Sequence, residues 1–177
     1  VYLSCPAENG LTYTLAELTE ISEYCRANSL YLFVDGARLG YGLQSEGCDL
    51  TLADLARLCD VFYIGGTKVG ALFGEAVVFS DKELKRSFRY AIKQHGGMLA
   101  KGRLLGIQFA ELLRGGNDCL YFELARHANR EAMRIRRAFE QKGIPMWNDS
   151  LTNMQFPALT KEQQSRLSEK YIFEVWG

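Results

Sequence analysis

The first half of the chain alternates between short apolar runs and amphipathic stretches. Apolar residues recur at helical spacing over 14–29, and Thr14 with Glu17 has the pattern of a capping box, so a helix is predicted there. The continuous apolar run at 30–34 is typical of a strand covered on both faces. Apolar runs predict further strands at 1–4, 61–64 and 75–80. Two more helices are predicted, one at 51–58 capped by Thr51 and Asp54, and one at 81–93 capped by Asp81.

Strands that alternate with helices form βαβ units, which predicts an α/β fold with a mostly parallel sheet and flanking helices. Glycines near residue 115 then interrupt a helical pattern. We therefore expect two parts, a larger one over 1–115 and a smaller α+β one over 116–177. Helices are expected at 100–113 and 119–143, the second ending at Gly143, followed by strand, strand, helix and strand at 144–148, 153–159, 160–171 and 172–177.

Charge and cysteine content narrow the class of protein. The 177 residues include 21 basic and 21 acidic side chains, so no overall field attracts nucleic acid or an anionic membrane. The five cysteines are irregularly spaced and contain no C-x-x-C pair, which argues against a disulfide framework and against a metal site. Reduced thiols in a cytoplasmic protein are the better interpretation. The chain starts without Met and both of its ends read as strands, so we expect a piece of a longer protein.

Two charged residues follow directly on apolar strands. Asp35 ends the apolar run in YLFVDGARLG, and Lys68 lies just beyond VFYIGG. A buried carboxylate and a buried amine both cost free energy unless a partner compensates them. Because the carboxyl ends of parallel strands meet at the edge where ligands bind, we expect Asp35 and Lys68 at the same edge of the sheet.

Nucleotide-binding motifs do not explain this pair. A Walker A lysine follows glycine and precedes Ser or Thr, whereas Thr67 precedes Lys68 and Val69 follows it. The glycines of DGARLGYG also lack the G-x-G-x-x-G spacing of a dinucleotide site.

Pyridoxal phosphate suits both charged groups. Its aldehyde condenses with a lysine amine, and a carboxylate beside its ring nitrogen favours the protonated, electron-withdrawing ring. Either residue taken alone is more often part of a turn or a solvated side chain. Together on consecutive strands, with Arg38 three residues after Asp35, they favour the cofactor.

The segments FVDGARLGYGL and FYIGGTKVGALFGEAVVF, followed by KGRLLGIQFAELL, resemble the low-specificity L-threonine aldolases, β-eliminating lyases among the fold type I pyridoxal-phosphate enzymes. The resemblance covers essentially the whole chain but only the middle and later part of a family member. It implies that 1–115 is the C-terminal half of the cofactor-binding large domain and 116–177 part of the small domain. The family's N-terminal portion, with its glycine-rich phosphate loop and stacking aromatic residue, has no counterpart here. Nor does its last strand, which carries a substrate-carboxylate arginine.

By this resemblance Lys68 is the catalytic lysine that carries pyridoxal 5'-phosphate, and Asp35 pairs with the ring nitrogen. Arg38 would lie near the phenolic oxygen and Thr67 close to the phosphate. The implied reaction is cleavage of L-threonine or L-allo-threonine to glycine and an aldehyde, carried out by a homodimer or homotetramer. Two alternatives remain open: another fold type I enzyme, such as a different β-eliminating lyase or an aminotransferase, and a folded fragment without catalysis.

Overall fold

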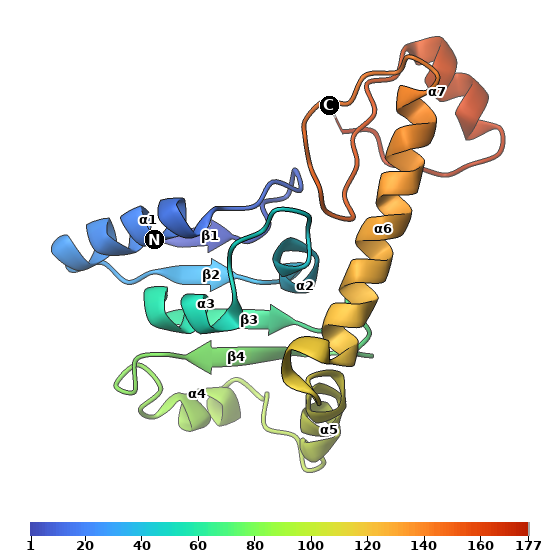
Figure 1. The fold of residues 1–177 in the computed structure, drawn as a ribbon. Coiled ribbons are helices and arrows are strands. Elements are labelled where there is room, and N and C mark those ends of the chain that lie inside the picture. The colour runs from blue at the N-terminus through green and yellow to red at the C-terminus, as the bar shows by residue number, and fades with distance from the viewer. Residues whose placement is uncertain (177) are drawn as a thin grey trace.

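A four-stranded sheet forms the centre of the structure, a computed structural model that describes residues 1–176. Strands β1 (Tyr2–Ser4), β2 (Phe33–Asp35) and β3 (Val61–Gly65) run parallel, and β4 (Glu75–Phe79) runs antiparallel to β3. The strands lie side by side in their sequence order (Figure 1). The predicted α/β fold with a mostly parallel sheet is confirmed.

Helices connect the parallel strands. α1 (Leu15–Ala27) links β1 to β2, and the short helices α2 (Leu39–Leu43) and α3 (Leu52–Leu58) lie between β2 and β3. Both α1 and α3 begin at the predicted capping boxes, in which the Thr14 and Thr51 hydroxyls accept a backbone N–H of the first turn. The sequence pattern does not predict α2, which has no side-chain cap.

The two faces of the sheet differ in their cover. Val34 and Phe62 lie on the face that packs against the helices, and both are buried. On the opposite face Tyr2 stacks on Phe33, with ring centroids 5.4 Å apart, and Tyr2 is 62% exposed. Within the described chain, the expectation that the run at 30–34 is covered on both faces is therefore wrong.

The helix after β4 begins later than predicted. Of the range 81–93 only the later part is helical, in α4 (Phe88–Gln94). Ser87 has φ +66°, a left-handed conformation that interrupts a helix. Asp81 caps no helix; its carboxylate accepts the N–H of Glu83 at 2.8 Å in a turn.

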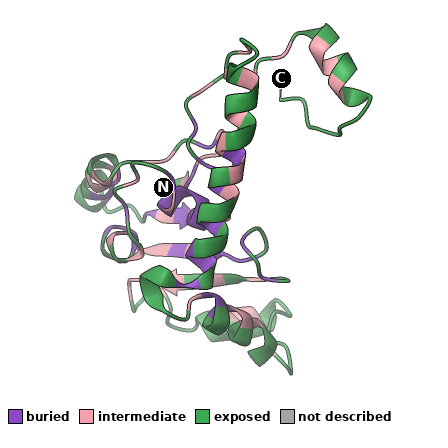
Figure 2. Cartoon of the chain, turned by 45° about the vertical axis from the view of Figure 1, so that its right-hand side comes forward, coloured by how far each residue is buried: buried purple, intermediate pink, exposed green. Residues whose placement is uncertain are grey.

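The next helices lead away from the sheet. α5 (Arg103–Leu112) and a 3-10 helix (Gly116–Asp118) precede α6 (Leu120–Glu140). One end of α6 packs against α2, and the other extends beyond the sheet (Figure 1). Gly143 follows with φ +70°, as expected of a glycine just after a helix. Figure 2 shows buried residues gathered at the sheet and the adjoining part of α6, whereas the C-terminal residues are mostly exposed.

The C-terminal part contains one further helix, α7 (Lys161–Ser168), and no strand within the described residues. The strands predicted at 144–148 and 153–159 meet only in one isolated antiparallel bridge. Residues 172–176 form no strand either, and Gly177 lies outside the described residues. These predictions are wrong for the described chain because an apolar run becomes a strand only where a neighbour takes up its backbone hydrogen bonds.

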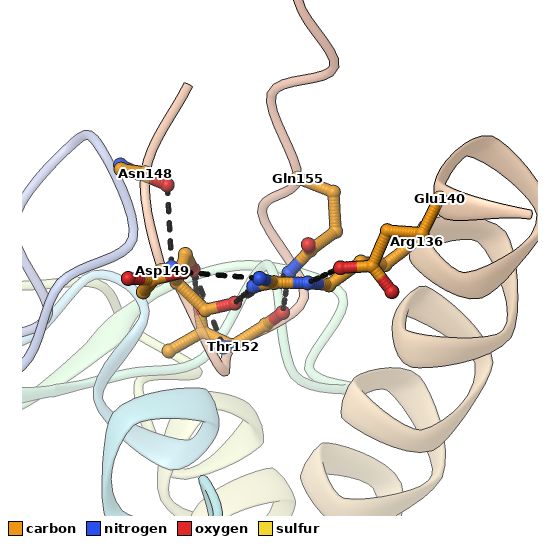
Figure 3. A network of polar contacts seen from close by, with 7 residues as sticks. Arg136, Glu140, Asn148, Asp149, Thr152 and Gln155 are labelled. Atoms are coloured by element: carbon orange, nitrogen blue, oxygen red, sulfur yellow. Dashed lines mark hydrogen bonds and ion pairs between the residues drawn. The ribbon is translucent and has the colours of Figure 1, made fainter. Parts of the chain in front are cut away.

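A polar network fixes the segment after α6. The Arg136 guanidinium, on α6, donates to the Glu140 carboxylate at 2.7 Å and to Asp149 at 3.1 Å. It also donates to the Ser150 carbonyl at 3.1 Å, so one side chain holds both α6 and the following loop (Figure 3).

The same segment is bonded to the loop that follows β1. The Ser150 and Thr152 hydroxyls lie 3.1 and 3.2 Å from the Gly10 carbonyl, and the Asn148 amide donates to the Asn9 carbonyl at 2.8 Å. Gly10 has φ +81°, and a Cβ there would lie 2.3 Å from the Ser150 Oγ, so the contact requires glycine. The two expected parts are thus hydrogen-bonded to one another, and the division between 1–115 and 116–177 stays a prediction.

All five cysteines are free thiols. Burial raises the pKa of Cys5 to about 12, with a further contribution from the neighbouring Cys48, and burial likewise raises the pKa of Cys59 to about 12. Thiols held neutral in this way are weak nucleophiles.

Among residues 1–176, no helix combines the length and the apolar composition needed to cross a membrane.

Candidate active site

The carboxyl ends of β1, β2 and β3 meet at one edge of the sheet. Ser4 lies opposite Asp35 in the register, and the Cys5 N–H donates to the Asp35 carbonyl at 2.8 Å. The Gly65 N–H, at the end of β3, donates to the Gly36 carbonyl at 2.9 Å. The turn after Asp35 is therefore fixed against the strand that leads to Lys68.

Asp35 is partly buried and surrounded by donors. The Tyr2 hydroxyl donates to Oδ2, and the Ala37 N–H donates to Oδ1 at 2.9 Å. Partial burial acts to raise the pKa of this carboxyl. The pKa is nevertheless held below its usual value by these hydrogen bonds, by the polar side chain of Tyr63 and by the nearby positive charge of Lys68. Asp35 is thus an anion at neutral pH.

Lys68 lies in the turn that begins the loop 66–74 between β3 and β4, and it is exposed in the described chain. The expectation of a buried amine is therefore wrong, although its charge is near enough to lower the pKa of Asp35. The start of the turn is fixed by Glu75, whose carboxylate accepts the Gly66 N–H at 2.8 Å. In its middle, the Tyr41 hydroxyl donates to the Lys68 carbonyl.

Glycines allow this turn to pack tightly. A Cβ at Gly36 would lie 1.8 Å from the Tyr63 carbonyl oxygen, and one at Gly65 would lie 2.4 Å from the Ala37 carbonyl oxygen. A Cβ at Gly66 would meet other atoms at 2.6 Å. These small residues therefore bring backbone against backbone, which places the turn after Asp35 beside the one that carries Lys68.

Arg38 and Thr67 complete the set of residues singled out in the sequence. Arg38 immediately precedes α2 and is partly buried, and Thr67 is exposed beside Lys68. Within residues 1–176, neither the Arg38 guanidinium nor the Lys68 ammonium has a carboxylate within 4.0 Å. Two cations free of direct ion pairs at one edge suit an anionic ligand.

Sequence reasoning missed the tyrosines of this site. Strand side chains alternate between the two faces of a sheet, so Asp35 shares a face with Phe33, two residues earlier. Tyr2 stacks on Phe33 and therefore lies on this face. Tyr63 also lies there, and it contributes to the pKa of Asp35. That alternation is a signal which could have found them. Nothing in the sequence pattern marks Tyr41, which reaches Lys68 only through the fold.

The arrangement can hold a flat ligand that has an electrophilic carbon and a basic nitrogen. A lysine amine is a nucleophile toward carbonyl carbon, and an ionised carboxylate stabilises a protonated ring nitrogen. The side chains present at this edge thus match the chemistry of the ligand expected from the sequence.

The sequence model of the family described as β-eliminating lyase matches residues 1–162. The chain belongs to the β-eliminating lyase family. The matched range includes all four strands and every residue of the candidate site.

Several low specificity L-threonine aldolases are similar to this chain. The low specificity L-threonine aldolase of Pseudomonas aeruginosa is 35% identical over 130 residues, which are 73% of this chain and 37% of that protein. The low-specificity L-threonine aldolase of Eremothecium gossypii is 27% identical over 175 residues, 96% of this chain and 44% of that protein. The chain therefore spans less than half the length of these curated relatives.

A solved structure of Leishmania major threonine aldolase has the same fold. It superposes with a TM-score of 0.91 at 45% sequence identity, covering 96% of this chain and 49% of that one. The agreement extends over both parts of the chain, so the fold type I architecture expected from the sequence is confirmed.

Proposed function

We propose that this chain contributes the lysine-bearing part of the active site of a pyridoxal-phosphate-dependent lyase. The proposed reaction is the cleavage of L-threonine, L-allo-threonine and related β-hydroxy amino acids to glycine and an aldehyde. The observation that carries the proposal is the meeting of Asp35, ionised, and Lys68 at one sheet edge. The names of the relatives support the choice of substrate.

The residues at the edge fit the cofactor. Lys68 would hold its aldehyde carbon and Asp35 its ring nitrogen, while Arg38 would lie near its phenolic oxygen and Thr67 near its phosphate. The Tyr2 bond to Asp35 does not prevent this, because a carboxylate oxygen can accept more than one hydrogen bond.

The mechanism assigns separate tasks to the two principal residues. The chemistry that the cofactor would supply when bound is an electron sink for cleavage of the substrate Cα–Cβ bond. Asp35 holds a proton at the ring nitrogen, which its lowered pKa allows because the carboxylate remains charged at neutral pH. Lys68 would hold the cofactor through its nucleophilic amine until a substrate amine takes the place of the lysine.

The proposal extends to partners and location. We expect a homodimer or homotetramer in the cytoplasm that acts on small amino acids. The absence of net charge and the free, mostly buried thiols are compatible with this.

The test is to add pyridoxal phosphate, reduce with borohydride and map the modified peptides. We expect one dominant adduct, on Lys68, and its loss in Lys68→Ala but not in Lys142→Ala, which changes an exposed lysine after α6. Adducts scattered over surface lysines would contradict the proposal and favour a folded chain without a cofactor site.

Substrate choice is tested separately, on a preparation that forms the Lys68 adduct. L-threonine should yield glycine and acetaldehyde in equal amounts. Release of ammonia and an oxo acid instead would assign a different β-eliminating reaction to the same site.

A further inference from the structure

The turn that carries Lys68 is held at three places. Its start is bonded to Glu75, and the Gly66 carbonyl accepts the N–H groups of Val69 and Ala71 at 2.9 and 3.0 Å. The third place is Lys68 itself, whose carbonyl accepts the Tyr41 hydroxyl. Within residues 1–176, no backbone N–H donates to this carbonyl, so the Tyr41 hydroxyl is its hydrogen-bond donor there, while the N–H of the same peptide group, that of Val69, donates to Gly66.

Tyr41 is in turn held rigidly by α6. It is 7% exposed, and the buried Asn129 side chain donates to its carbonyl at 2.8 Å. One residue earlier, the Gly40 N–H donates to the Tyr121 hydroxyl at 3.0 Å, and a Cβ at Gly40 would lie 2.8 Å from the Tyr121 ring. Asn129 and Tyr121, both on α6, thus fix α2. Because the Tyr41 hydroxyl bonds the Lys68 carbonyl, the position of α2 in turn determines the position of the turn that carries Lys68.

We propose that Tyr41 is a positioning residue, whose hydroxyl fixes the Lys68 peptide so that the amine stays beside Asp35. The effect of Tyr41 on catalysis rests on the proposed function, because it requires that Lys68 is the residue that holds the cofactor. The hydrogen bond itself can be tested without any cofactor.

The hydroxyl matters because the Lys68 side chain is exposed and long. No side-chain contact to the ammonium holds it in place within the described residues. Its location therefore depends on where its backbone lies. Removing the phenol oxygen leaves the packing of the ring intact but frees the carbonyl, so the turn can rotate and carry the amine away from Asp35.

The first test is hydrogen exchange of the chain without cofactor, comparing Tyr41→Phe with the unmodified protein. We expect the Val69 and Ala71 amides to exchange roughly tenfold faster, while the amides of α1 keep their rates. The matched control is Ser22→Ala, which also removes a buried hydroxyl that donates to a backbone carbonyl, that of Leu58 at 2.6 Å, but lies in α1 and contacts neither α2 nor the lysine turn through this bond. Unchanged exchange in Tyr41→Phe, or equal acceleration in both variants, would overturn the proposal.

The second test is the borohydride adduct described above. Tyr41→Phe should lower the share of adduct on Lys68 several-fold at a temperature where both chains are folded, and a share equal to that of the unmodified chain would overturn the role. If the unmodified chain gives no Lys68 adduct, the proposed function fails. The exchange result then still decides whether Tyr41 fixes the turn.

Discussion

At the scale of single residues, Asp35 illustrates how neighbours decide the state of a charge. Partial burial alone would favour the neutral acid, yet donors from Tyr2 and Ala37 and the charge of Lys68 keep it ionised. The hydrogen bonds from the surrounding residues thus offset part of the free-energy cost of placing a carboxylate at the end of a strand.

Tyr2→Phe tests this explanation through the pH dependence of stability. Because the folded pKa of Asp35 is lowered, its contribution is present above the ordinary value of about 3.9 and is lost as pH falls through the folded pKa. The variant should lose less than about 1 kcal/mol at pH 7, since Tyr2 is largely exposed, and the difference should shrink in acid. Urea unfolding between pH 7 and pH 2.5 measures it, with the exposed Tyr24→Phe as the control. A difference that does not vary with pH would remove Asp35 from the explanation.

At the scale of elements, local sequence signals determine where helices begin, and close backbone contacts determine how the turns lie against one another. Capping boxes determine where α1 and α3 begin, whereas Ser87 delays α4 by its backbone conformation. Between β2 and β3 the decisive feature is the close approach of backbone at Gly36 and Gly65. This approach brings the two turns of the candidate site together.

Gly65→Ala should therefore destabilise the fold, because its Cβ would lie 2.4 Å from the Ala37 carbonyl oxygen and neither backbone segment can move easily. We expect a loss of about 1–3 kcal/mol, measured by urea unfolding. Gly106→Ala is the matched control, since that helical glycine has no atom within 4 Å of the added Cβ. It should gain up to about 1 kcal/mol from helix propensity. Equal effects of the two substitutions would show that backbone contact at Gly65 is unimportant.

At the scale of the whole molecule, α6 joins the two parts of the chain. Its first half holds α2 and, through Tyr41, the lysine turn. Its second half carries Arg136, which fixes residues 148–155 beside the loop after β1 (Figure 3). The same helix thus positions the candidate site and anchors the C-terminal part.

Arg136→Ala should release the C-terminal segment without disturbing the sheet. The Arg136 side chain is 15% exposed and its guanidinium bonds three groups, so its loss leaves the Ser150 carbonyl without that donor. Hydrogen exchange should rise at least several-fold over 148–155 and stay unchanged in β1 to β3. The control is Arg134→Ala, whose side chain is 69% exposed and pairs with Glu131. Faster exchange throughout the chain would contradict a local anchor.

The sequence by itself determined the alternation of strands and helices, the starts of α1 and α3, and the placing of Asp35 and Lys68 at one edge. These follow from local periodicity, caps and the shared direction of parallel strands. Only the tertiary structure decided that Tyr41 holds the Lys68 peptide, that Tyr2 bonds Asp35, and that the apolar runs after α6 form no strands. Such features depend on contacts between residues as much as 33 positions apart, or on a neighbouring strand being present. No local pattern encodes them, because their free energy arises only when distant segments meet.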